Sequence, residues 1–308
     1  MIRFTMPDPA QGKEARAKAL MQQFDAFLGS GAMQTLLRLL DTDIHGIAEK
    51  YGARRKEDGS VFETQELKED TSLEKNRDGI YECLRELGFF DISRPLSSDY
   101  SRILILGASL NNSYLRTKCS AEWITPGVSS VDGLACFRPI NPIERTDNGF
   151  RTDSDTEFGA VSDSIVSVFD LERDKWQDDF TGNRNLNSIS CIRTYPEKKH
   201  GCTFRVFAAP STDAAIRRAD TGDTLEYYLD NAGINPGETL LAITNNRYCN
   251  RQFIQLAYHI IRSDHPVGLD VIGNLGDRDI VNAETYDPLQ YLQDVIAIID
   301  WIDRFAKL

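Results

Sequence analysis

The stretch RILILGAS at residues 102–109 decides the fold class of this 308-residue chain. Its apolar residues are consecutive, whereas a strand with one face in water alternates apolar and polar residues. A continuous apolar run therefore predicts a strand that is buried on both faces of a parallel sheet. The small residues that close the run predict a turn, and the pattern that follows predicts a helix over residues 114–123.

The same order of strand, loop and helix recurs along the rest of the chain. Further strands are predicted in GLACFRPINP (133–142), CTFRVFAAP (202–210), TLLAITNN (239–246) and GLDVIGN (268–274). Helices are predicted over 160–169, 224–232, 251–261 and 291–305, and a polar loop over 175–188. This alternation is typical of an α/β protein, here a Rossmann-like three-layer sandwich with a mostly parallel sheet.

The beginning of the chain has another pattern, which predicts a helical N-terminal region (1–95) ahead of the α/β domain (100–308). Apolar residues at helical spacing predict helices over 15–28, 33–51 and 76–87, the last of them ended by Gly88. Charged residues over 54–76 predict an exposed connection. Two roles are open for these helices: an interaction or lid module, or a cover for one edge of the sheet. We favour the second.

Composition narrows the range of partners. The chain has 35 Lys and Arg against 47 Asp and Glu, a net charge of −12, which repels nucleic acid and anionic membranes. No apolar stretch has the length of a signal peptide or a membrane span. The six cysteines form no CxxC pair and only four histidines accompany them, which indicates reduced thiols rather than disulfides or a zinc site. We expect a cytoplasmic protein without nucleic-acid or membrane partners, and leave open whether copies associate.

Ligands of such sheets bind beyond the carboxyl ends of the strands, so the residues after each apolar run are the candidates. The first run is followed by Gly107, Ala108, Ser109, Asn112 and Arg116. Small residues let a ligand approach the backbone, and the next helix offers free N–H groups. A plain turn with hydroxyl capping explains the same residues as well. The glycines do not form the GxGxxG pattern of dinucleotide sites.

The second run is followed by Arg138, which is suited to bidentate capture of phosphate or carboxylate. The simpler hypothesis for a single arginine is an ion pair with one of the many acidic residues.

Two carboxylates are candidates for acid–base or metal-binding roles. Glu157 starts the helix EFGAVSDSIVSVF, where a carboxylate also simply complements the helix dipole. Asp223 has capping-box spacing to Glu226, so helix capping is its alternative role. Thr221 and Thr224, beside Asp223, are candidate ligand hydroxyls.

The densest polar cluster follows the fourth run and favours a binding function. It contains Thr244, Asn245, Asn246, Arg247 and Arg251. Cys249 lies within it as a candidate nucleophile, but no histidine is near it in sequence, and most cysteines are simply buried.

The order of these features resembles the YdcF, SanA and ElyC group of Rossmann-like proteins. The matching features are the first apolar strand with Arg116, the glutamate-led helix with Glu157, a threonine-containing segment, and a last strand with a polar loop. The segment and the loop contain Thr221, Thr224, Thr244 and Arg251. The chain is more similar to the YdcF type, because the membrane anchor of other members is not expected here. The resemblance implies a nucleotide-like or phosphorylated small ligand.

The leading hypothesis is therefore an enzyme, a hydrolase or group transferase, acting on an anionic or nucleotide-like metabolite. Arginines would bind negative charge, and Glu157 or Asp223 would transfer protons or bind a divalent metal. The alternatives are a ligand-binding or regulatory protein without turnover, and a protein that binds S-adenosylmethionine at the GAS turn. S-adenosylmethionine sites usually have an acidic residue at the end of the second strand, where it binds the ribose. Arg138 stands at that position here, so this alternative is less favoured.

Overall fold

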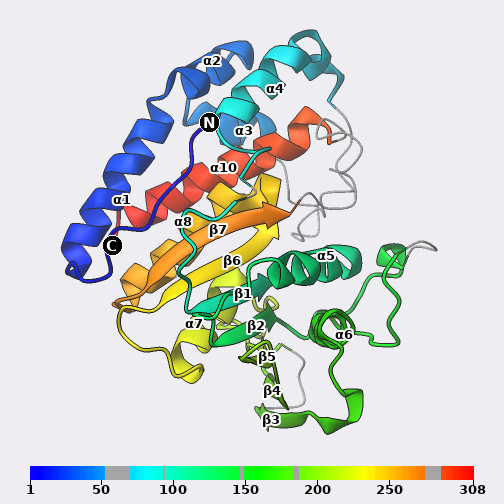
Figure 1. The fold of residues 1–308 in the computed structure, drawn as a ribbon. Coiled ribbons are helices and arrows are strands. Elements are labelled where there is room, and N and C mark those ends of the chain that lie inside the picture. The colour runs from blue at the N-terminus through cyan, green and yellow to red at the C-terminus, as the bar shows by residue number, and fades with distance from the viewer. Residues whose placement is uncertain (53–69, 93, 146–148, 183–186, 275–285) are drawn as a thin grey trace.

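The carboxyl-terminal two thirds of the chain build a seven-stranded sheet with the order β3-β4-β5-β2-β1-β6-β7 (Figure 1). The computed structural model describes residues 1–52, 70–92, 94–145, 149–182, 187–274 and 286–308. Five strands are parallel to one another: β1 (Arg102–Leu106), β2 (Ser130–Ala135), β5 (Cys202–Ala208), β6 (Thr239–Asn245) and β7 (Gly268–Asn274). The predicted α/β class with a mostly parallel sheet is confirmed.

The sheet reverses its direction of growth between β1 and β6. After β1 the chain adds β2 and β5 on one side, then returns to add β6 and β7 on the other. The helices accordingly divide between the two faces. On one face lie α5 (Leu110–Ala121) and α6 (Glu157–Phe169), and on the other α7 (Thr221–Asn231) and α8 (Cys249–Arg262). The carboxyl ends of β1 and β6 thus form the topological switch point, where ligands of open α/β sheets bind.

Strand β1 shows why its apolar run is continuous. Ile103 and Ile105 belong to the core under α5 and α6, whereas Leu104 and Leu106 belong to the core on the opposite face. Successive side chains of a strand point to opposite faces, so a strand covered on both faces needs apolar residues at every position.

The N-terminal helices add a further layer on the α8 side of the sheet (Figure 1). They are α1 (Lys13–Leu28), α2 (Gly31–Leu39), α3 (Gly46–Tyr51), η2 (Thr71–Asn76) and α4 (Arg77–Glu86). They pack on one another, on α8 and on the last helix, α10 (Pro288–Phe305), and share one apolar core with them. The helices therefore cover other helices, while an extended segment covers the edge strand: Gly273 N donates to Ile92 O over 2.7 Å.

The single helix predicted over 33–51 is wrong, since it is broken after Leu39. Asp41 has a φ of +49°, and the amides of Asp41 and Thr42 donate to the carbonyls of Arg38 and Leu37. These two bonds form a Schellman motif, which ends a helix through one left-handed residue. Aspartate tolerates that conformation better than most residues, and it is a weaker sequence signal than the Gly88 that follows α4. Most of the predicted connection over 54–76 lies outside the described residues.

The predicted loop over 175–188 is also partly wrong. It contains β3 (Gln177–Thr181), which pairs antiparallel with β4 (Ser190–Lys199), and β4 pairs antiparallel with β5. All five residues of β3 are exposed, so the strand lacks the apolar pattern on which the prediction depended. The helices α5, α6 and α7 begin three or four residues before the spans predicted for them, and the first turns of α5 (LNNS) and α7 (TGDT) are mostly polar.

A buried carboxylate joins α7 to the centre of the sheet. Asp132 on β2 is fully buried and accepts hydrogen bonds from Arg205 Nε (2.8 Å) and Nη2 (3.0 Å) on β5. It also accepts one from the Tyr228 hydroxyl of α7 over 2.7 Å. Burial first, and then the Asp132 charge, raises the pKa of Tyr228, so the phenol stays a donor. The charge of Asp132 is thereby paired and bonded, as a buried charge requires.

Replacing Asp132 by alanine should destabilise the fold by about 3 kcal/mol, because the substitution removes the carboxylate that pairs with the half-buried Arg205 and bonds to Tyr228. Tyr228→Phe removes one bond to the same carboxylate and should cost about 1.5–3 kcal/mol. Urea unfolding followed by circular dichroism measures both values. A loss below 1 kcal/mol for Asp132→Ala would show that the carboxylate does not hold α7 to the sheet.

Candidate functional site

Arg116 bridges the switch point from the second turn of α5. Its Nε and Nη2 donate to Asn245 Oδ1 at the end of β6, over 2.9 and 2.5 Å. Its Nη1 donates to the carbonyls of Leu106 and Gly107 at the end of β1, over 2.7 and 2.9 Å. One guanidinium thus joins the two strand ends at which the chain leaves for opposite faces of the sheet.

Every one of these acceptors is a neutral oxygen. The residue is 2% exposed, and burial lowers the pKa of Arg116 to about 10, while the nearby Glu157 carboxylate acts against that fall. The guanidinium remains charged at neutral pH. It is a buried cation that forms no ion pair with any carboxylate of the described residues, an arrangement that costs free energy unless an anion approaches.

A second predicted arginine of this edge, Arg138, is paired with carboxylates. Its Nε donates to Glu157 Oε2 over 2.9 Å, its Nη1 to Glu144 Oε1 over 2.5 Å, and its Nη2 to the Ala108 carbonyl over 3.0 Å. Burial alone would lower the pKa of Arg138, but the two glutamates raise it. The sequence left open whether Arg138 binds a ligand or forms an ion pair, and the structure has the ion pair. Its bond to the Ala108 carbonyl also holds the loop after β1.

Glu144 was not a candidate from the sequence, yet it occupies the start of α5. Its Oε2 accepts from the Leu110 amide over 3.0 Å, so the helix N-terminus already binds a carboxylate. Burial raises the pKa of Glu144, but Arg138 and the amides outweigh this and lower it. The sequence signal was the capping box Asn141–Glu144, which places this side chain. Ser109 is the N-cap residue of α5, and its hydroxyl accepts from Asn112 Nδ2 instead of capping the helix.

Gly107 has room for no side chain because Glu157 lies against it. A Cβ at this position would be 1.8 Å from Glu157 Oε1 and 2.8 Å from the Leu134 carbonyl. Glu157 begins α6, and its Oε2 is engaged by Arg138 and approached by the Cys136 thiol at 3.8 Å. Oε1 has no hydrogen-bond partner among the described residues. The glycine therefore admits a buried carboxylate, rather than a phosphate, to the turn after β1.

The polar cluster after β6 divides between two directions. Asn245 turns toward α5, where its Nδ2 donates to Asn112 Oδ1 over 3.0 Å. Arg247 and Arg251 turn toward α10 and share the fully buried carboxylate of Asp294, with Nη2–Oδ2 and Nη1–Oδ1 distances of 2.6 and 2.5 Å. The structure thus brings Asn112, Arg116 and Asn245 together, and holds Arg247 and Arg251 in a separate ion-pair network.

The segment at the end of β6 also has buried polar atoms without a hydrogen-bond partner among the described residues. They are Thr244 Oγ1, both side-chain polar atoms of Asn246, and Arg247 Nη1. Thr244 is fully buried and Asn246 is 3% exposed. Buried polar groups in folded proteins are nearly always hydrogen-bonded, so these atoms mark a place where a ligand or water belongs.

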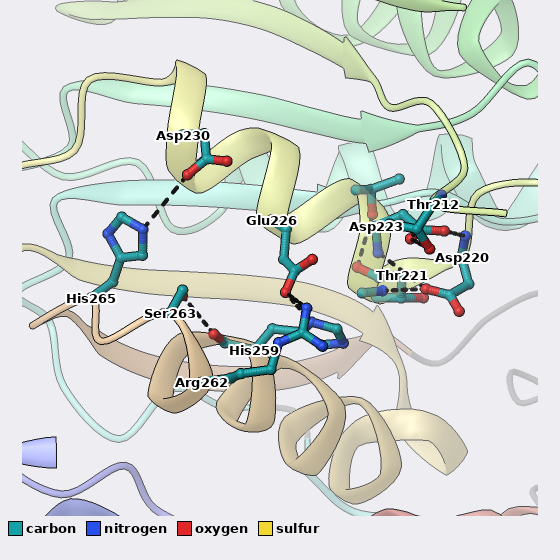
Figure 2. A network of polar contacts seen from close by, with 12 residues as sticks. Thr212, Asp220, Thr221, Asp223, Glu226, Asp230, His259, Arg262, Ser263 and His265 are labelled. Carbon is teal, nitrogen blue, oxygen red and sulfur yellow. Dashed lines mark hydrogen bonds and ion pairs between the residues drawn. The ribbon is translucent and has the colours of Figure 1, made fainter. Parts of the chain in front are cut away.

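The other carboxylate candidate, Asp223, caps α7 (Figure 2). The capping box joins Asp220 and Asp223, so the predicted pairing of Asp223 with Glu226 is wrong. Arg217 and Thr212 engage the Asp223 carboxylate as well. Burial raises its pKa, but these partners lower it below the usual value. The Thr224 hydroxyl donates to the carbonyl of Thr221 over 3.0 Å. These contacts are those of a helix start, and they lie on α7 rather than at the switch point.

Glu226 instead joins α7 to α8 (Figure 2). Its Oε1 lies 2.9 Å from His259 Nδ1 and also accepts from Arg262. The imidazole fits because residue 222 is glycine: a Cβ there would be 2.1 Å from His259 Nε2. His259 is thus a packed residue of the interface between α7 and α8.

Cys249 is fully buried at the start of α8, and burial raises the pKa of its thiol. A neutral thiol is a poor nucleophile, so the structure does not support the nucleophile hypothesis. Among the residues that the structure describes, no three His, Cys, Asp or Glu side chains are grouped as metal ligands would be.

Gly107→Ala should destabilise the chain by about 1–3 kcal/mol, because the new methyl group forces the Glu157 carboxylate away from Arg138. Gly127→Ala is the matched control, since its Cβ would meet no atom closer than 3.5 Å. Denaturant unfolding should show no loss for the control. Equal stability of the two variants would contradict the packing of Glu157 against Gly107.

No protein-family model, curated protein or solved structure matches this chain. No helix within the described ranges has both the length and the apolar character needed to cross a membrane.

Proposed function

We propose that the chain binds a small anionic molecule, nucleotide-like or phosphorylated, at the switch point between β1 and β6. The observation that carries this proposal is Arg116, a buried guanidinium whose bonds all go to neutral oxygens. A phosphate or carboxylate brought near it gains a charge-assisted interaction in a poorly hydrated place, where such interactions are strong. The resemblance to the YdcF group, which shares this arginine position, supports the same ligand class.

The charges around the strand ends favour an anion too. Among the described residues, four arginines lie there, at positions 116, 138, 247 and 251, and three carboxylates pair with the last three of them: Glu144, Glu157 and Asp294. In a chain with a net charge of −12, these seven described side chains keep one positive charge in excess. A local field of that sign attracts anionic metabolites to a protein that otherwise repels them.

Glu157 is the acid–base group of the proposed site. One of its oxygens is held by Arg138, and Oε1 faces Gly107 without a hydrogen-bond partner among the described residues. A carboxylate fixed in this way can accept a proton from a nucleophilic water or hydroxyl next to an anion bound by Arg116. This geometry suits hydrolysis or group transfer. Asp223 is left out, because capping and ion pairing use its oxygens.

One observation favours the second candidate, binding without turnover. Glu144 already occupies the N-terminus of α5, so an anion must bind beside it or displace it. Competition between an internal carboxylate and a ligand is a means of sensing ligand concentration.

Asn245→Asp is the sharpest test, because it supplies Arg116 with the carboxylate that it lacks. The variant should be more stable than the wild type and should bind anions at least tenfold more weakly. The measurement is a thermal-shift and calorimetric titration with inorganic pyrophosphate, AMP and ribose 5-phosphate. A probe at about a hundred times its Kd should stabilise the wild type by about 2.7 kcal/mol.

Asn231→Asp, on the exposed end of α7, is the matched control, since it changes the net charge equally and should leave affinity unchanged. If both variants bind the probes as the wild type does, or if no probe binds the wild type, the anion site is not at Arg116.

A further inference from the structure

A cavity lies on the outer side of α5, next to the carboxyl end of β7. Its volume is about 880 Å³, within the range of small-molecule sites. Three segments line it: the extended stretch 94–100, the second half of α5 with the turn after it, and the carboxyl end of β7. The floor is fixed, because the Tyr100 hydroxyl donates to Asp270 of β7 over 2.5 Å.

Asn274, at the carboxyl end of β7, is one of the residues that line the cavity. Both its Nδ2 and its Oδ1 are buried and have no hydrogen-bond partner among the residues that the structure describes. A carboxamide offers a donor and an acceptor side by side, and its complement is an adjacent acceptor and donor. Purine edges present that pair, and asparagine binds adenine in this bidentate way in other settings.

The rest of the lining fits a flat heterocycle with a negative substituent. Trp123 offers an aromatic surface on which a base can stack, and Leu115 lies near it in the wall. Arg94 and Lys118 are exposed at the lining, with Glu122 as the one acidic residue, so the cavity has more positive than negative charge. Such charges attract a phosphate.

We propose that this cavity binds a purine nucleotide, with the base on Trp123 and Asn274 and the phosphate toward Arg94 and Lys118. This proposal does not rest on the function proposed for the switch point, from which it uses no residue.

The test uses the full chain with Trp176 and Trp301 replaced by phenylalanine, so that Trp123 is the only tryptophan left of three. AMP and GMP, with adenosine and inorganic phosphate as partial probes, are titrated against its fluorescence. A saturable change with a nucleotide is expected. Asn274→Leu should weaken nucleotide binding about tenfold or more, because the bidentate contact is lost. It should not unfold the chain, because it replaces buried, unpartnered polar atoms by apolar ones.

Asn245→Asp separates this site from the switch point, since it should change the nucleotide affinity at Trp123 by less than about twofold. Cys119 gives a second readout. It lines the cavity, and the other five of the six cysteines are buried. Burial raises the pKa of the Cys119 thiol to about 11, so its alkylation is followed at mildly alkaline pH. Bound AMP should slow this alkylation.

Two results would overturn the proposal. If AMP binding is lost in Asn245→Asp and kept in Asn274→Leu, the nucleotide binds at the switch point and the cavity is not its site. If neither AMP nor GMP changes Trp123 fluorescence or Cys119 alkylation at millimolar concentration, the cavity does not bind purine nucleotides.

Discussion

The bond between Arg116 and Asn245 is the constraint on which the carboxyl edge of the sheet depends. Neighbouring strands β1 and β6 send their helices to opposite faces, the arrangement at which open α/β sheets bind ligands beyond the strand ends. Arg116 joins these two strand ends, because it binds Asn245 and the carbonyls of Leu106 and Gly107 at once. This one guanidinium therefore ties the turn after β1 to the end of β6.

The carboxylates near Arg116 serve other arginines. Glu144 and Glu157 bind Arg138, and Asp294 binds Arg247 and Arg251. Ion pairs therefore order the edge on both sides of Arg116. Arg116 itself has no carboxylate partner among the described residues. An ordered, poorly hydrated place with an uncompensated charge is suited to binding, because little reorganisation is needed when the ligand arrives.

The sequence predicted what depends on local pattern. Continuous apolar runs located the five parallel strands, and the residues after them included Arg116, Arg138 and Glu157. It could not predict pairing between distant segments: that Arg116 meets Asn245, or that Asp294 of α10 takes Arg247 and Arg251, is decided by packing. The exposed strand β3 and the left-handed Asp41 were missed because neither has a strong local signal. Asn274 could not be predicted as a site residue, because the cavity that it lines is formed by segments that are distant in the sequence.

Crystals of the full chain soaked in sodium tungstate would test the central claim most directly, because tungsten scatters anomalously and tungstate resembles phosphate. The account predicts an anomalous peak at the carboxyl ends of β1 and β6, within hydrogen-bond reach of Arg116 and Asn112. A peak at Arg94 and Lys118 alone would place the anion in the cavity beside α5. That result, or no peak at the strand ends, would contradict the claim that the unpaired charge of Arg116 makes the switch point an anion site.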